Sequence, residues 1–398
     1  MNQMQDAYIV AYGRSPIGKG KASGAYAFSR PDDIAGQVLK GVVDRVDGDF
    51  KPEMIEDLIV GTAFPESVQG MNVARTIALL AGLPQSTPGQ TVNRYCSSGL
   101  QTIAMAANAI MSEQADIIAA GGVEFMSKVP MGGTEPTNNP TLESADEGVS
   151  YPMGLTAEMV AEEHNVSRQE QDEFAVQSHQ RAHSAQTEGR LDHEIIPVEI
   201  EQVNYTDEGP KSEKITFKTD QGIRPESTVE TLAKLPTIFK KNGTVTAGSS
   251  SQVSDGTGFV VVMSGRKVQE LGVTPIARFV GYKAVGVDPK IMGIGPAYAI
   301  PEVLELTGLK LEDIDLIELN EAFASQAIAS VKKLGIDMAI TNVNGGAISL
   351  GHPLGATGAI LTSRLLSEMK RQEDSKYGLV SMCIGGGMGA AAIFEYMR

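Results

Sequence analysis

The sequence predicts an α/β fold built from two similar halves, with a different segment inserted between them. Apolar, strand-like stretches alternate with helical ones along most of the 398 residues, which is typical of strands and helices packed in layers, with parallel strands. The same series of elements occurs twice in the same order, which indicates a duplication. The stretch 123–250 differs in character from both halves, so we expect an inserted subdomain there.

The duplication rests on four pairs of segments that lie roughly 250–270 residues apart. In each half a first strand is followed by a second strand, a Val-Asn pair before a glycine-rich turn, and a strand that ends in glycines. The repeated Val-Asn pair argues against a chance likeness between generic strand–helix patterns. The paired segments are 7–12 with 276–282, 55–61 with 311–318, 91–93 with 342–344, and 117–122 with 379–386.

Composition and charge fit a globular protein and exclude two classes of function. The net charge of −16 argues against non-specific binding to nucleic acid or to an anionic membrane surface. The chain has no run of roughly 18 or more apolar residues, so no transmembrane helix is expected. It also shows no secretory signal and has only two cysteines, so we expect a reducing, cytoplasmic location.

Each of the two cysteines lies in its own glycine-rich turn. Cys96 follows the strand-like pair 91–92 and precedes an apolar helix predicted over 100–111. The helix N-terminus would favour the thiolate of Cys96, and therefore a nucleophile. Both Cys96 and Cys383 could equally be buried structural thiols, because a free cysteine packs as a small hydrophobic residue.

His352 and Asn320 are the polar residues best placed to support such a thiol. His352 is the only histidine outside 164–193 and lies in the glycine-rich stretch 345–358, where Pro353 suits the first position of a helix. It could act as the base for a thiol, or be a hydrogen-bonded structural residue. Asn320 follows the strand 316–319 and could support an oxyanion or cap the next helix, and the spacing alone does not separate these roles.

A second helix is predicted to begin with the capping box at 167–170 and to continue to about residue 186. It carries His179 and His183 at a spacing that can bind metal, but no third ligand is evident. We therefore expect no metal site and place both histidines on a solvated helix face. The small, hydroxyl-rich stretch 246–256 could line a narrow channel or be an ordinary loop.

Six segments in one order resemble the thiolase family, the CoA-dependent acyltransferases that cleave or form 3-ketoacyl-CoA. The resemblance covers the whole chain and rests on residues 93–99, 151–158, 244–256, 320–323, 344–358 and 383–389. It implies a five-layered fold of two duplicated βαβαβ-containing halves, with a loop domain that covers CoA. The implied limits are 1–122 with 251–270 for the N-terminal half, 123–250 for the loop domain and 271–398 for the C-terminal half.

The resemblance also implies a role for each catalytic residue. Cys96 would be the nucleophile that becomes acylated, and His352 would take its proton. Cys383 would be the general acid and base at the α-carbon of the substrate. Asn320 would hold a water that shares one oxyanion hole with His352, and the backbone N–H groups of Cys96 and Gly385 would form the second.

Contacts to CoA follow from the same resemblance. Ser251, Met153 and Arg224 would touch the pantetheine or the nucleotide of CoA. CoA would be a co-substrate, and neither a permanently bound cofactor nor a metal is implied. The partners would be CoA and acyl-CoA, with assembly as a homodimer or homotetramer and a possible multienzyme partner in β-oxidation.

The segments around Arg94, Pro152 and Gln252 are closer to the degradative 3-ketoacyl-CoA type than to biosynthetic acetoacetyl-CoA thiolases. We therefore expect degradation of substrates of broad chain length. The alternatives are a biosynthetic thiolase that forms acetoacetyl-CoA and a thiolase-like acyl-CoA binding protein without catalysis. The turn around Cys383 argues against a ketoacyl synthase.

Overall fold

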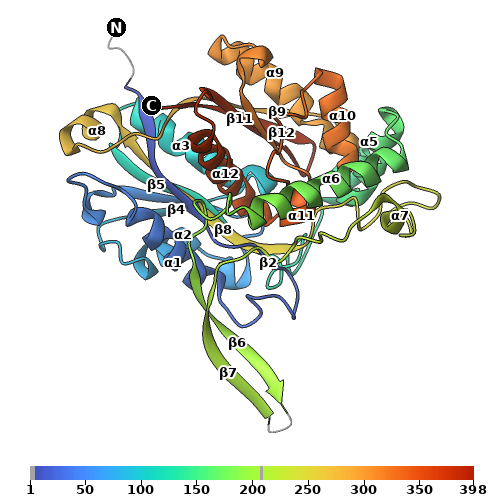
Figure 1. Ribbon diagram of the computed structural model, residues 1–398, viewed down its shortest axis with the longest axis horizontal. Coiled ribbons are helices and arrows are strands. Elements are labelled where there is room, and N and C mark those ends of the chain that lie inside the picture. The colour runs from blue at the N-terminus through green and yellow to red at the C-terminus, as the bar shows by residue number, and fades with distance from the viewer. Residues whose placement is uncertain (1–4, 207–208) are drawn as a thin grey trace.

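Two β-sheet halves alternate with three layers of helices in the computed structural model, which describes residues 5–206 and 209–398 (Figure 1). The N-terminal sheet has the strand order β4-β3-β5-β8-β1, and the C-terminal sheet has the order β10-β11-β12-β9. A short pairing of β1 with β9 joins them. The bounds are β1 Ala7–Arg14, β3 Asp57–Gly61, β4 Gly89–Val92, β5 Ile117–Phe125, β8 Ser254–Ser264, β9 Ala277–Gly286, β10 Leu316–Leu319, β11 Tyr377–Ile384 and β12 Met388–Tyr396.

The predicted duplication is confirmed by these strand orders. The two members of each predicted pair occupy equivalent places in the two sheets. In the C-terminal half, a parallel bridge between Ile317 and Thr341 takes the place of the pairing between β3 and β4.

The expected parallel pairing of strands holds for β4, β3 and β5 and for β10 and β11. It is wrong for β1, β8, β9 and β12, whose pairings are all antiparallel. For β12 the reason is the tight turn at Gly386 and Gly387, because a hairpin can join only antiparallel strands.

Helices fill the three other layers of the predicted five-layered fold. The outer layers are α1 and α2 on the N-terminal sheet and α9 and α10 on the C-terminal sheet. The central layer consists of α3, which is apolar nearly all round, and α12, which is buried along almost its whole length and also carries polar residues; together they bury one hydrophobic core against both sheets. The bounds are α1 Pro31–Val43, α2 Val73–Leu80, α3 Ser98–Met111, α9 Pro296–Thr307, α10 Ala324–Leu334 and α12 Thr357–Arg371.

The two central helices touch through glycine at their first turns. A Cβ built on Gly358 of α12 would lie 2.2 Å from the backbone nitrogen of Leu100 in α3. A Cβ on Gly99 would lie 3.0 Å from the backbone of Ala359 and of Gly355. Backbone therefore packs on backbone where these two helices begin, and the residues just before each helix are brought together.

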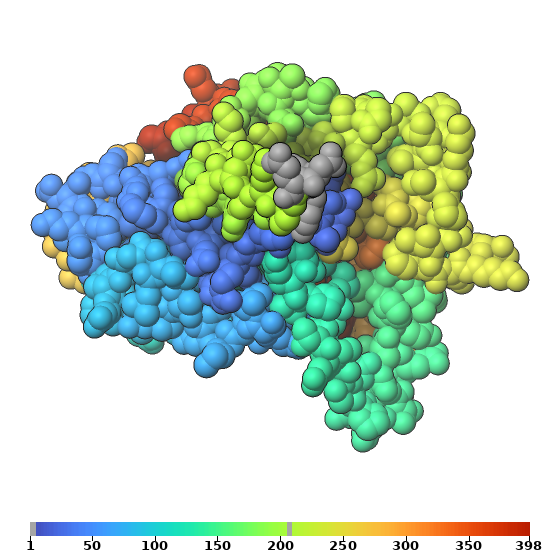
Figure 2. Space-filling view, turned by 90° about the horizontal axis from the view of Figure 1, so that it is seen from below, coloured from blue at the N-terminus to red at the C-terminus, as the bar shows by residue number. Residues whose placement is uncertain are grey.

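The inserted region contributes helices that pack on the C-terminal half and a hairpin that projects from the body (Figure 1). Its predicted capping box is confirmed at α6, where Ser167 and Glu170 bond each other's backbone N–H groups. In Figure 2 the segments near residues 125–150 and 225–245 frame one end of the molecule. The domain limits at 123 and 250 stay predictions. The bounds are α4 Pro140–Ala145, α5 Met153–Glu163, α6 Arg168–Thr187, β6 Val198–Thr206, β7 Gly209–Phe217 and α7 Val229–Leu232, with β2 Gly18–Lys19, α8 Gly265–Leu271 and α11 Ala347–Leu350 elsewhere.

Buried ion pairs fasten the inserted region to both halves. Arg14 of β1 is fully buried and pairs with Glu194 at 2.6 Å and with Asp220 at 2.8 Å. In α12, the Nη1 atom of Arg364 lies 3.5 Å from Glu318 Oε2, and its Nε atom lies 3.7 Å from Oε1 of the same Glu194. Within the described parts of the chain, no helix is long and apolar enough to cross a membrane.

Gly358→Ala should lower the free energy of unfolding by about 1–3 kcal/mol, the usual cost of forcing extra volume into a packed core. The added methyl group would collide with backbone of α3, which cannot turn aside as a side chain can. Urea unfolding followed by circular dichroism measures the change. Gly286→Ala is the matched control, because a Cβ there meets no atom within 4 Å. Equal stability of the two variants would contradict the close crossing of the helices.

Candidate active site

One cavity of about 240 Å³ brings together six of the eight site residues predicted from the sequence. These six come from all parts of the chain: Cys96, Met153, Ser251, His352, Cys383 and Gly385. Most of the remaining wall is apolar and is formed by Phe64, Tyr95, Met131, Val149, Met292, Ala322, Phe323, Leu354 and Gly386. Asn320 reaches the cavity through His352, and Arg224 does not line it.

Cys96 lies in the turn between β4 and α3, where the backbone is bent sharply. Tyr95 has a φ of +43°, a left-handed conformation that is strained for a residue with a side chain. Ser98 holds this turn, since its Oγ accepts from the Arg94 N–H at 2.9 Å and donates to the Tyr95 carbonyl at 2.6 Å. The Cys96 thiol opens on the cavity, and the backbone N–H of Gly385 donates to it.

The Cys96 thiol is protonated at rest, contrary to the expectation of a thiolate at a helix N-terminus. Burial raises the pKa of Cys96 to about 11, and the nearby charge of Glu124 adds to the rise. The Gly385 N–H lowers this pKa, but by less than burial raises it. A base must therefore take the proton when Cys96 attacks.

His352 can be that base, because its ring is buried and neutral. Burial lowers the pKa of His352 to about 4. The Nδ1 atom lies 2.6 Å from Thr357 Oγ1, whose hydroxyl donates to the Pro353 carbonyl. Thr357 therefore accepts from Nδ1–H, which leaves the lone pair of the neutral ring on Nε2. The helical turn begins at Leu354, so Pro353 precedes the first helical position predicted for it.

Asn320 supports His352 and does not cap a helix. Its amide Nδ2 lies 3.3 Å from His352 Nε2. The alternative of a capping role is wrong, because the N-cap of α10 is Phe323. The Asn320 Oδ1 atom is buried and has no hydrogen-bond partner within the described residues.

Cys383 is the second-last residue of β11 and is fully buried, with its Sγ atom 3.7 Å from Gln326 Oε1. Burial is the largest influence on the pKa of Cys383 and raises it, and the neighbouring Cys96 raises it further. Both cysteines are free thiols. The two thiols are thus neutral groups on one cavity, which suits one as nucleophile and the other as a proton donor.

The three residues predicted to contact CoA divide into two groups. Met153 and Ser251 both line the cavity. Met153 is the first residue of α5, and the backbone N–H of Ser251 donates a hydrogen bond to the Ala322 carbonyl at 2.9 Å. Arg224 is exposed, and its backbone N–H donates to His179 Nδ1 at 3.2 Å. His179 is buried, so the solvated face predicted for it is wrong, whereas His183 is exposed as expected.

Glu124 is a structural support of the site that the sequence reasoning missed. This buried carboxylate accepts from the Ala63 N–H at 2.6 Å and from the Gly355 N–H at 2.8 Å. It thereby holds the turn after His352 against the end of β3. A charged residue inside a strand that is buried along its whole length was the available signal.

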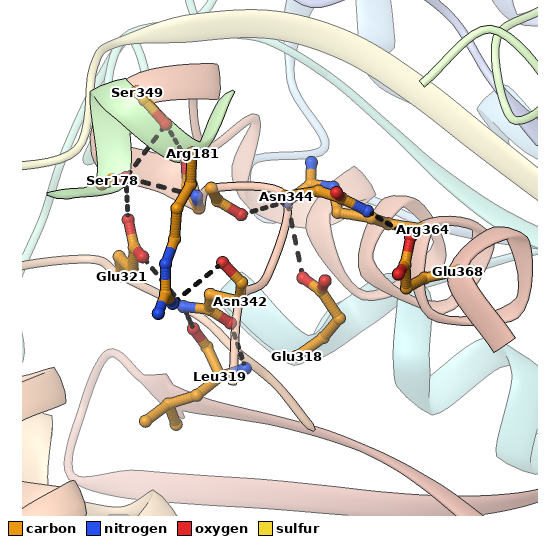
Figure 3. A network of polar contacts seen from close by, with 12 residues as sticks. Ser178, Arg181, Glu318, Leu319, Glu321, Asn342, Asn344, Ser349, Arg364 and Glu368 are labelled. Atoms are coloured by element: carbon orange, nitrogen blue, oxygen red, sulfur yellow. Dashed lines mark hydrogen bonds and ion pairs between the residues drawn. The ribbon is translucent and has the colours of Figure 1, made fainter. Parts of the chain in front are cut away.

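Glu321 directly follows Asn320 and braces this turn through its contacts with Ser178 and Asn342, which Figure 3 shows. Its carboxylate accepts from Ser178 of α6 at 2.7 Å and from the amide of Asn342 at 2.9 Å. Asn342 in turn accepts from the Leu319 N–H at 2.9 Å and donates to the Leu319 carbonyl at 2.8 Å. The inserted helix α6 thus takes part in positioning the site.

Alkylation of Cys96 by iodoacetamide should speed up with rising pH until the pH reaches about 11, because the thiolate reacts and the pKa is about 11. The measurement is the rate of adduct formation by mass spectrometry in a Cys383→Ala background. In Glu124→Gln the rise should move to lower pH, because a negative charge that disfavours the thiolate is gone. A plateau of the rate at neutral pH would contradict the neutral thiol.

Comparison with known proteins agrees with this geometry. The family model for the thiolase N-terminal domain matches residues 7–266, and the model for the thiolase C-terminal domain matches residues 273–396. The chain is 50% identical over 395 residues to 3-ketoacyl-CoA thiolase of Bacillus subtilis, which covers 98% of this chain and 100% of that protein.

Solved structures are similar over the same length. Human mitochondrial 3-ketoacyl-CoA thiolase in complex with CoA is 38% identical, with a TM-score of 0.88 over 99% of this chain and 98% of that one. The dimeric peroxisomal thiolase of Saccharomyces cerevisiae is 39% identical, with a TM-score of 0.89 over 100% of this chain and 99% of that one. With both family models matched in order along nearly its whole length, the chain belongs to the thiolase family.

Proposed function

We propose that this protein is a 3-ketoacyl-CoA thiolase, which transfers an acyl group to CoA and releases acetyl-CoA. The observation that carries the proposal is the meeting of Cys96, His352 and Cys383 on one cavity. The names of relatives such as the Bacillus subtilis enzyme support the same activity. Claisen cleavage needs a nucleophile at the 3-keto carbon and an acid at the leaving carbon, and the two thiols supply one each.

In the first half-reaction the Cys96 sulfur attacks the 3-keto carbon while its proton moves to His352 Nε2. The C2–C3 bond then breaks, which leaves the acyl group on Cys96 and the acetyl-CoA enolate beside it. Cys383 gives its proton to C2 of that enolate and becomes a thiolate. His352 and a water held by Asn320 stabilise the enolate oxygen.

The second half-reaction returns the acyl group to CoA. The thiol of a free CoA molecule attacks the acyl carbon, a new C–S bond forms, and the bond from that carbon to Cys96 breaks. The Cys383 thiolate takes the proton of the CoA thiol, and His352 returns its proton to Cys96, so both residues regain their resting states. The N–H groups of Cys96 and Gly385 stabilise the oxyanion of this step, a role suited to Gly385 because its N–H already lies against the Cys96 sulfur.

Substrate contacts follow from the cavity wall. Met153 and Ser251 would contact the pantetheine, and Arg224, which lies outside the cavity, would contact the nucleotide. The human neighbour was solved in complex with CoA, which supports CoA as co-substrate. The apolar wall at Phe64 and Leu354 suits an alkyl chain, in line with degradation of substrates of broad chain length in β-oxidation.

Assembly and location complete the proposal. A homodimer is supported by the dimeric yeast neighbour. A tetramer and a multienzyme partner in β-oxidation are further assemblies that size-exclusion chromatography and pull-down would test. A cytoplasmic location is supported by the two free cysteines, and cell fractionation tests it.

Brief incubation with acetyl-CoA should leave an acetyl group on Cys96, detected by mass spectrometry of the digested protein. Cys96→Ala should form no adduct, because the nucleophile is absent. Cys383→Ala should still form it but lose thiolysis by about 10²–10⁴-fold, the usual effect of a general acid. CoA binding without an adduct in the wild type would instead indicate a non-catalytic acyl-CoA binding protein.

Thiolysis should proceed on 3-ketooctanoyl-CoA and longer substrates as well as on acetoacetyl-CoA, because most of the cavity wall is apolar. The measurement is kcat/KM across a series of 3-ketoacyl chain lengths. Cleavage of acetoacetyl-CoA alone would overturn the degradative assignment and favour the biosynthetic one.

A further inference from the structure

We propose that Gln326 is a positioning residue for proton transfer, which holds the S–H group of Cys383 on its side-chain carbonyl. The inference rests on the function proposed above and names a residue outside the six segments that resemble the family. Gln326 is fully buried in the first turn of α10, and its Oε1 lies 3.7 Å from Cys383 Sγ. A thiol can donate a weak hydrogen bond at such a sulfur–oxygen distance.

The orientation of the Gln326 amide is fixed by contacts other than Cys383. The backbone N–H of Ala322 donates to the same Oε1 at 3.0 Å, so the carbonyl faces Cys383. Gly293 packs against the stem of the side chain, since a Cβ there would lie only 2.6 Å from Gln326 Cβ. The Nε2 group is buried without a hydrogen-bond partner among the described residues, so both polar contacts of the amide are on its carbonyl.

The contact therefore distinguishes the two protonation states of Cys383. A carbonyl oxygen accepts a hydrogen bond and cannot donate one, so it stabilises the thiol and offers nothing to the thiolate. During cleavage the S–H bond breaks, a C–H bond forms at C2 of the enolate, and the contact to Gln326 is lost. In the reverse direction the Cys383 thiolate takes the α-proton of acetyl-CoA and the contact forms again.

Few other groups near Cys383 can influence the equilibrium between its thiol and its thiolate. The titratable residues that line the cavity with Cys383 are Tyr95, Cys96 and His352. Cys383 otherwise packs in a hydrophobic cluster that includes Ala157, Val245 and Met292. Gln326 thus supplies a polar contact made directly to the thiol.

Gln326 also has a structural use, because its bond to the Ala322 N–H caps the start of α10. Ser325→Ala is a matched control for this use. The Ser325 hydroxyl donates to the Ala157 carbonyl at 3.0 Å, so the variant removes one buried hydrogen bond from the same helical turn without touching Cys383.

The experiment follows loss of deuterium from acetyl-CoA labelled on its methyl group, measured by mass spectrometry over a range of pH. Gln326→Met should slow this exchange by about tenfold or more. A correctly positioned base contributes ~10²–10⁴-fold to a rate, and loss of the contact to Gln326 should remove part of that contribution. Its pH profile should move to lower pH, because the thiol has lost its acceptor. Gln326→Glu keeps an acceptor and adds negative charge, so its profile should move to higher pH.

Alkylation of Cys96 by iodoacetamide shows that each variant retains an intact site. Equal slowing of exchange in Gln326→Met and Ser325→Ala, with unchanged pH profiles in both Gln326 variants, would overturn the role of Gln326. A wild-type protein that neither forms the adduct on Cys96 nor loses deuterium would instead overturn the proposed function.

Discussion

The geometry of the site depends on the contact between the first turns of α3 and α12. Gly99 and Gly358 let these helices meet backbone to backbone, with no side chain between them. Cys96 lies just before one helix and His352 shortly before the other, so the crossing sets the separation of the proposed nucleophile and the proposed base. Each helix belongs to a different copy of the duplicated unit. The duplication thus provides two equivalent helix N-termini, and the crossing converts them into one site.

Burial is the second constraint, and it makes the resting site electrically neutral. It raises the pKa values of both cysteines and lowers that of His352. In the proposed mechanism the negative charge of the acyl-transfer step would meet uncharged donors, namely the backbone N–H groups of Cys96 and Gly385. Such fixed dipoles avoid the cost of holding an unneeded ion pair in a buried site and are already oriented when charge develops.

Buried carboxylates hold this neutral site in place from outside. Glu124 ties the turn after His352 to the N-terminal sheet, and Glu321 ties the turn at Asn320 to α6. A buried charge is costly unless it is hydrogen-bonded, and each of these carboxylates is surrounded by donors. The inserted region therefore supports the catalytic turns through Ser178 while it also supplies Met153 to the cavity wall.

Local patterns and motif order in the sequence were enough to predict the α/β layers, the duplication, the capping box of α6 and the two glycine-rich turns that meet at the cavity. The direction of β8 depended on tertiary connections, whereas that of β12 follows from the local turn at Gly386 and Gly387. Tertiary structure also decided that Asn320 faces His352 and not a helix end, that His179 is buried, and that Arg224 lies outside the cavity. The protonation of Cys96 belongs to the same group, because a sequence shows the N–H groups beside a thiol but not how much protein surrounds it.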